Sequence, residues 1–187
     1  MLTITQAPTT QKLMTAEEAA QLSTVNRRFE LVKGVYIEMS PASAKHGKVA
    51  MKIALLVGLH VESQRLGEAT AAETGFLLSR SPDTVRAPDV AFIRRARLPD
   101  PPPRGFADFP PDLAVEVLSP SDRPGEVAEK VDDWLKAGTA LVWVMDPIAV
   151  TANVYRADGS ASTVAADGAL DGEDVLPGFS LPLRELA

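Results

Sequence analysis

The stretch DLAVEVL, residues Asp112–Leu118, decides the fold. Apart from Glu116 its interior is apolar, so both faces of an extended strand would be apolar. Strands of this kind lie in the middle of a sheet that is covered on both sides. We therefore expect a central strand that carries one acidic side chain.

The chain after this strand predicts a helix and a second buried strand. Ser119–Pro124 breaks the central strand, and the helix runs to about Ala137, where Gly138 ends it. Ala140–Met145 is again almost entirely apolar, and Asp146-Pro147 stops it.

The chain before the central strand predicts two more strands, Thr74–Leu78 and Asp89–Ile93, with a turn at Ser81-Pro82-Asp83. Residues Leu98–Pro111 hold six of the fifteen prolines, which is too many for the interior of a helix or strand. This segment is predicted to be a stiff exposed loop.

A long helix is predicted further toward the N-terminus. Ser43 can cap it, and it reaches about Arg65, with Gly67 as its stop. Its predicted buried stripe at helical spacing consists of Met51, Ala54, Leu55, Gly58 and Leu59.

The N-terminal part of the chain predicts a short helix and a hairpin. Thr15, followed by two glutamates, begins the helix, and Lys33-Gly34 forms a turn between Arg28–Val32 and Val35–Met39. The whole order predicts an α/β fold of the mixed α+β kind, with a central mixed sheet flanked by helices.

The composition is that of a globular protein. The 187 residues suit one domain, which we place at residues 14–187 after a flexible arm at residues 1–13. Hydrophobic residues make up 45% and charged residues 24%. No apolar run reaches the roughly 18 residues that span a membrane, and no secretory signal is visible. Zero cysteines exclude disulfides, thiolate zinc sites and cysteine nucleophiles, and we expect a cytoplasmic protein.

Two acidic residues stand in apolar strands. Glu116 shares its strand face with Ala114 and Leu118, and Asp89 begins the strand Asp89–Ile93. An ionised carboxylate is costly there unless a cation or a set of hydrogen bonds compensates it. Carboxylates on neighbouring central strands could share a Mg²⁺ ion. The alternative is a structural ion pair between Glu116 and a buried arginine or lysine.

Lys130 lies on the helix that follows Glu116. Val127, Val131 and Trp134 have the spacing of a buried helix face, and Lys130 lies on or beside that face. Its side chain either points toward the carboxylates or extends past Trp134 into water.

Several segments together resemble the Uma-two family of endonucleases, within the PD-(D/E)XK superfamily. The similarity runs in order from about residue 14 to the C-terminus. It is carried by Phe29–Gly34, Met39-Ser40-Pro41, His46, Pro88–Phe92, Val115–Ser121, Glu129-Lys130, Val142–Pro147 and the closing LPGFSLPLREL.

The resemblance implies a restriction-endonuclease-like αβββαβ core and a site in it. Asp89 and Glu116 match the two acidic residues of the superfamily, and Glu30 matches the acidic residue of the first helix-strand region. The usual lysine position, two residues after the second acid, holds Leu118 instead. The family resemblance moves that lysine to Lys130.

The resemblance also implies a mechanism of phosphodiester hydrolysis. A Mg²⁺ (or Mn²⁺) ion would be held by Asp89, Glu116 and the backbone carbonyl of Val117. Lys130 would orient the attacking water or offset charge on the phosphate. Glu30 would hold a second metal or position Lys130. His46 is a candidate for contact with the substrate, or else a solvated histidine.

The expected partner is nucleic acid, with DNA as the substrate, and a homodimer would suit an enzyme that cuts both strands. The net charge of −6 argues against free duplex DNA, because nucleic-acid binders usually present a basic surface. Three alternatives stay open: an inactive nuclease fold used for binding or assembly, a metal-dependent hydrolase of a phosphoester other than nucleic acid, and an ion-pair network without metal. No nucleophile elbow or phosphate-binding glycine loop is present.

Overall fold

The computed structural model describes residues 13–22 and 28–187. The predicted N-terminal arm lies, except for Leu13, outside the described residues. The helices are α1 (Ala16–Leu22), α2 (Ala44–Gln64) and α3 (Pro124–Ala137), with 3₁₀ turns at Arg95–Arg97 and Leu183–Leu186. The strands are β1 (Phe29–Val32), β2 (Val35–Glu38), β3 (Gly67–Ala71), β4 (Phe76–Ser79), β5 (Thr84–Arg86), β6 (Val90–Arg94), β7 (Leu113–Val117), β8 (Leu141–Asp146), β9 (Thr151–Arg156), β10 (Ala161–Val164), β11 (Ala169–Asp171) and β12 (Ser180–Pro182).

A six-stranded mixed sheet forms the centre of the molecule, in the order β10-β9-β8-β7-β6-β3. β7 runs parallel to β8, and the other neighbouring strands are antiparallel. All five residues of β7 are buried, because the strand lies inside the sheet and both of its faces are covered. The predicted central strand is therefore confirmed.

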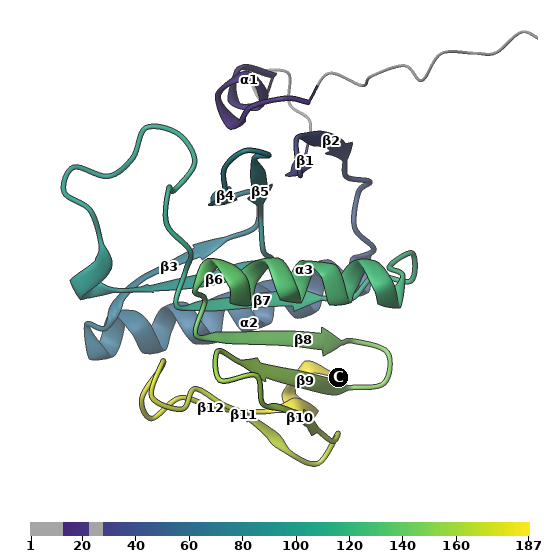
Figure 1. Ribbon diagram of the computed structural model, residues 1–187. Helices are drawn as coiled ribbons and strands as arrows, with labels where there is room; N and C mark the ends of the chain where they lie inside the picture. Colours follow the sequence, from purple (N-terminus) through teal and green to yellow (C-terminus); the bar gives the residue numbers. More distant parts are fainter. Residues whose placement is uncertain (1–12, 23–27) are drawn as a thin grey trace, which may run out of the picture.

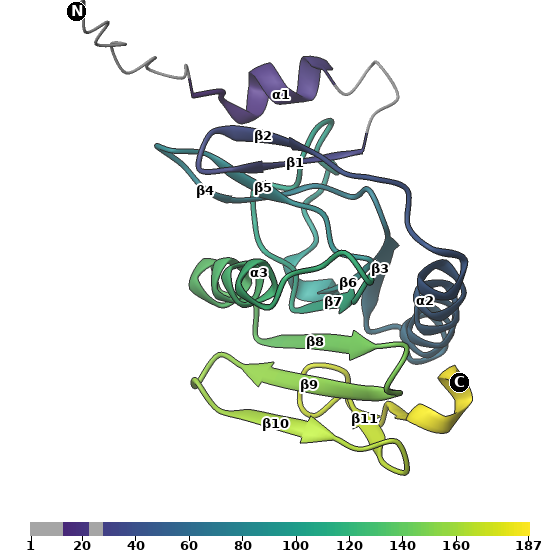
Figure 2. The same ribbon diagram turned by 90° about the vertical axis from the view of Figure 1, so that its right-hand side faces the viewer.

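One helix packs on each face of this sheet (Figures 1 and 2). Buried valines and Ile53 of α2, together with the C-terminal segment, pack against the face of the sheet that carries Trp143. On the other face, Val131 and Trp134 of α3 pack against Ala114 and its neighbours. The helices and strands of this core occur along the chain in the order α2, β3, β6, β7, α3, β8. This is the expected αβββαβ core.

A second, four-stranded sheet lies beside the first, in the order β2-β1-β5-β4 (Figure 2). Leu31 of β1 and Val85 of β5 form a small core with two buried alanines of α1. The predicted hairpin is confirmed, with Lys33 and Gly34 at φ values of 50° and 78° in its turn. This sheet brings Glu30 of β1 to the edge of the central sheet.

Helix α2 begins and ends by identifiable caps. The Ser43 side chain accepts a hydrogen bond from the backbone N–H of His46, as the sequence predicts. The helix ends at Gln64, and Arg65 takes the left-handed conformation at φ 54°. Gly67 is therefore not the stop of the helix: it is the first residue of β3.

The predicted buried stripe of α2 is wrong for its three large side chains, although its Ala54 packs against the core. Met51, Leu55 and Leu59 are 62%, 46% and 59% exposed, and the residues in contact with the sheet are another set at helical spacing. That buried set consists of His46, Val49, Ile53, Val57 and Val61. The helix carries apolar residues on two faces, and the sequence pattern does not reveal which of them meets the sheet.

One strand prediction also shifts, and the structure adds a strand. The segment Thr74–Leu78 forms its strand later, as β4, and an additional strand, β3, precedes it directly after α2. Leu98–Pro111 contains no regular strand, and most of its residues are exposed, as its prolines predict. Within the described residues no helix combines the length and apolar character needed to cross a membrane.

Candidate active site

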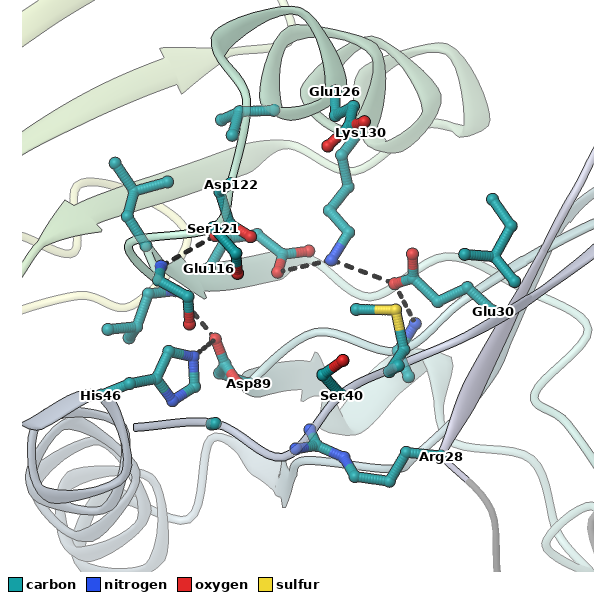
Figure 3. A pocket seen from close by; sticks show the side chains of 18 of the residues that line it. Arg28, Glu30, Ser40, His46, Asp89, Glu116, Ser121, Asp122, Glu126 and Lys130 are labelled. Carbon is teal, nitrogen blue, oxygen red and sulfur yellow. Dashed lines mark hydrogen bonds and ion pairs between the residues drawn. The ribbon is translucent and has the colours of Figure 1, made fainter. Parts of the chain in front are cut away.

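A pocket of about 690 Å³ opens where the two sheets meet the start of α2 and one side of α3 (Figure 3). Its walls include Glu30, His46, Asp89, Glu116 and Lys130, so the side chains that the sequence nominated lie around one cavity. They come from β1, α2, the residue before β6, β7 and α3.

Glu116 occupies the floor of this pocket and has fixed hydrogen-bond partners. Its Oε1 accepts a hydrogen bond from Trp134 Nε1 at 2.9 Å, and its Oε2 accepts one from Lys130 Nζ at 3.1 Å. Burial raises the pKa of the Glu116 carboxyl to about 7, because the attraction of Lys130 is outweighed by burial and by the negative charges of Glu30 and Asp89. Burial contributes most to this shift, so the ionised carboxylate is poorly solvated in its position.

Lys130 lies between two carboxylates. Its Nζ is 3.1 Å from Glu116 Oε2 and 3.0 Å from Glu30 Oε1 (Figure 3). Burial alone would lower the pKa of Lys130, but the two carboxylates outweigh burial and raise it, so the ammonium stays charged. The pKa of Lys130 and that of Glu116 are both raised, because Lys130 faces two acids whereas Glu116 shares a single ammonium with Glu30. The side chain points toward the sheet, as the helical spacing predicts, and not into water.

Arg86 and Asp133 extend the charged cluster and were not foreseen from the sequence. Arg86 donates to Glu30 Oε2 at 2.8 Å and to Asp133 Oδ2 at 2.6 Å, with all three side chains largely buried. Burial would raise the pKa of Glu30, but Lys130 and Arg86 together lower it. The sequence offered little sign of them, because neither residue interrupts an apolar pattern and their pairing depends on how β5 meets α3.

Asp89 lies at the start of β6 and contacts the end of β7. Its Oδ2 accepts a hydrogen bond from the backbone N–H of Val117 at 2.8 Å. The register pairs Val90 with Val115, so Asp89 and Glu116 occupy neighbouring positions at the same end of the two strands. Val117 is buried, and its backbone adjoins the Asp89 carboxylate.

His46 is a buried partner of Asp89. The ring Nε2 lies 3.2 Å from Asp89 Oδ2, and the histidine is 8% exposed, so the interpretation as a solvated histidine is wrong. The hydrogen bond to Asp89 raises the pKa of His46. Nδ1 of the ring is buried and has no partner in the described part of the chain.

The donors of the pocket suit a divalent cation. Asp89 and Glu116 supply carboxylate oxygens, the ligands that Mg²⁺ prefers. Each Glu116 oxygen accepts one hydrogen bond and keeps a second lone pair, and both contacts of Asp89 fall on Oδ2, which leaves Oδ1 for a cation. Four largely buried carboxylates (Glu30, Asp89, Glu116 and Asp133) face two permanent cations, Arg86 and Lys130, together with His46. Within the described residues, no group of three or more histidines and acids is arranged to hold a metal. A cation here would have two carboxylate ligands and complete its shell with water or a backbone carbonyl.

The rim of the pocket is also acidic. Asp122, Glu126 and Glu129 lie on the side of α3, and Glu38 lies on the side of β2 (Figure 3 labels the first two). Asp122 accepts a hydrogen bond from the backbone N–H of Ser119 at 2.8 Å. Arg28 also lines the pocket and Lys33 Nζ lies 2.6 Å from Glu129, so the acids that would repel a polyanion are balanced only in part.

Comparisons with known proteins identify one family. The model of the Uma2 family, described as "Putative restriction endonuclease", matches residues 16–184. A solved structure from Anabaena variabilis ATCC 29413, of "a putative nuclease belonging to DUF820", is similar with a TM-score of 0.81. That similarity covers 92% of this chain and 97% of the other at 22% sequence identity, and it shows a common fold. No curated protein matches the chain. Because the family model covers nearly the whole sequence, the protein belongs to the Uma2 family.

Proposed function

We propose that the protein is a divalent-metal-dependent endonuclease that hydrolyses phosphodiester bonds, with DNA as its substrate. The observation that carries the proposal is the buried pair Asp89 and Glu116 in one pocket, with Lys130 Nζ 3.1 Å from Glu116. Four carboxylates, of Glu30, Asp89, Glu116 and Asp133, face the permanent cations Arg86 and Lys130, and this balance favours a bound cation over a closed ion-pair network. Family membership supports a nuclease in general terms.

Each side chain has a part in this proposal. Asp89, Glu116 and the carbonyl of Val117 would hold Mg²⁺ or Mn²⁺, which lowers the pKa of bound water and offsets phosphate charge. Lys130 donates hydrogen bonds that orient the water or the phosphate oxygen. Glu30 positions Lys130 from its other side. His46 holds Asp89 in place and lies close enough to the cavity to contact the substrate.

A second candidate is a metal-dependent hydrolase of a small phosphoester. The acidic rim favours it, because a small substrate brings less negative charge into the pocket than a nucleic acid does. An inactive binding module explains less, since it gives no reason to keep buried carboxylates at a cost.

The proposal is tested with purified protein on plasmid DNA, single-stranded DNA, RNA and bis(p-nitrophenyl) phosphate. With Mg²⁺ or Mn²⁺ we expect nicking or degradation of DNA, and EDTA should stop it. Asp89→Ala and Glu116→Ala should abolish cleavage while circular dichroism shows folded protein. Cleavage of bis(p-nitrophenyl) phosphate alone would favour the second candidate, and activity that survives both substitutions would refute this site.

Lys130 has a matched control on its own helix. Lys136 is 76% exposed and pairs with Asp132 at 2.6 Å, away from the pocket. Lys130→Ala should lower the cleavage rate at least about 100-fold, the size of a lost electrostatic contact in an active site, with metal affinity little changed. Lys136→Ala should cleave like the wild type. Equal activity of both variants would contradict the role of Lys130.

A further inference from the structure

The outward face of α2 carries an apolar stripe that no described element covers. Met51, Leu55 and Leu59 succeed one another at four-residue spacing and are 62%, 46% and 59% exposed. Figure 2 shows α2 at the border of the molecule, with β3 on its inner side and the C-terminal turn near its outer side. Three large apolar side chains in one row on a helix are typical of an interaction surface.

Two opposite charges beside this stripe lie at equal distances from Leu55. Lys48 precedes Met51 by three residues, and Glu62 follows Leu59 by three residues; both are exposed. We define the outer α2 face as Lys48, Met51, Leu55, Leu59 and Glu62. Suppose that a second helix of the same sequence lies antiparallel on this face, centred on Leu55. Each residue then faces the residue of the second copy that lies equally far from Leu55 in the opposite direction. Met51 then meets Leu59 of the second copy, and Lys48 meets its Glu62.

Two further features fit a close approach of two such helices. Gly58 has open space where a Cβ would lie, and the same pairing places the stem of Lys52 from the second copy over it. A shallow groove of about 330 Å³ lies beside the stripe, between α2 and the C-terminal turn, and includes Met51, Leu55 and Leu186. It can receive the Leu59 side chain of the second copy.

We infer that the outer α2 face binds a second copy of this chain in a two-fold symmetric, antiparallel α2–α2 contact. The arrangement is isologous, so one face supplies both the apolar row and the two opposite charges. A contact made by one helix from each copy is small, and we expect a dissociation constant on the order of 10–100 µM.

The first experiment measures the oligomeric state of the full chain by sedimentation velocity across this concentration range. We expect a monomer–dimer equilibrium for the wild type, and a monomer for Leu55→Glu, which places two carboxylates opposite each other on the symmetry axis. Ile148→Glu is the matched control, since Ile148 is 73% exposed on the turn between β8 and β9. A wild type that stays monomeric, or a dimer that Leu55→Glu leaves intact, would overturn the inference.

Charge exchange tests the antiparallel register itself. Lys48→Glu and Glu62→Lys each place like charges opposite each other twice per dimer and should weaken dimerisation about tenfold. The double variant restores both pairs and should regain most of the wild-type affinity. A double variant weaker than either single one would exclude this register.

Because the chain has no cysteine, Leu55→Cys gives an independent reading. Two copies of residue 55 meet on the symmetry axis, within the distance that a disulfide can span. Mild oxidation should give a covalent dimer for Leu55→Cys and only monomer for Ile148→Cys at the same concentration. Equal cross-linking of the two variants would count against the proposed face.

Discussion

Among single residues, Glu116 couples the stability of the fold to pH, because its carboxyl lies at the floor of the pocket with a side chain only 9% exposed. Its pKa of about 7 in the folded protein exceeds the ordinary value of 4.5, so the folded state holds the proton more tightly than the unfolded chain does. The stabilisation that this provides is complete below about pH 4.5 and is lost as the pH rises to about 7. Ionised Glu116 without metal therefore costs folding free energy.

Glu116→Gln should remove this pH dependence. In EDTA, the free energy of unfolding of the variant relative to the wild type should rise by up to about 3 kcal/mol between pH 5 and pH 8. Urea unfolding at several pH values measures the difference. A constant difference across this range would show that Glu116 stays ionised as part of a satisfied ion pair.

The sequence located part of the site because some of its residues break a local pattern. Glu116 interrupts an apolar strand, and Lys130 lies beside the buried stripe of a helix, so each is visible without a structure. Arg86 and Asp133 break no such pattern, and their pairing depends on how the small sheet meets α3. The roles of these residues in catalysis stay predictions.

At the level of elements, Arg86 joins three of them: its own β5, β1 through Glu30 and α3 through Asp133. Arg86→Met keeps much of the side-chain volume but leaves two buried carboxylates without this partner. We expect a loss of about 3–5 kcal/mol in the free energy of unfolding, the range for breaking a buried ion pair by removing one partner. Denaturant unfolding of the purified variant measures it.

Arg80→Met is the control for this change. Arg80 also contacts two acids, Glu17 and Asp83, but its side chain is 53% exposed and water screens both pairs. Its substitution should change stability little. Equal losses for the two arginines would show that the buried position of Arg86 is not what matters.

Helix α2 illustrates where element prediction from sequence fails. Its boundaries follow from local chemistry, the Ser43 cap and the left-handed Arg65, and the cap was foreseen. Its orientation follows from packing: Val49, Ile53 and Val57 form one apolar row, and the exposed Met51, Leu55 and Leu59 form another. Periodicity detects both rows and cannot rank them, because the sheet that selects one is formed by distant strands.

For the whole molecule, the predicted mixed sheet flanked by helices is confirmed by the structure and by the similar solved fold. The second sheet β2-β1-β5-β4 was not predicted, although the β1–β2 hairpin was. Its strands are three or four residues long, and short strands leave too little pattern to reveal their partners. The assignment of residues 14–187 to one domain remains a prediction.

Metal binding should stabilise the whole fold, because a ligand held by the folded chain alone shifts the unfolding equilibrium. With saturating Mn²⁺ or Mg²⁺ we expect the Tm of the wild type to rise by about 5–10 °C relative to EDTA. Asp89→Asn should lose most of this rise, whereas Lys136→Ala should keep it. Differential scanning fluorimetry measures the three proteins, and an unchanged rise in Asp89→Asn would place the metal elsewhere.

The dispersal of the pocket along the chain has a consequence for biosynthesis. Glu30 belongs to the first strand, whereas Lys130 belongs to α3, near the end of the central sheet's αβββαβ order. Contacts between such distant segments form only after the intervening chain is available to fold. A polypeptide still on the ribosome therefore has no assembled pocket until α3 has emerged. A fragment released earlier by premature termination lacks Lys130, and before β7 it lacks Glu116 as well, so incomplete products of translation cannot carry this site.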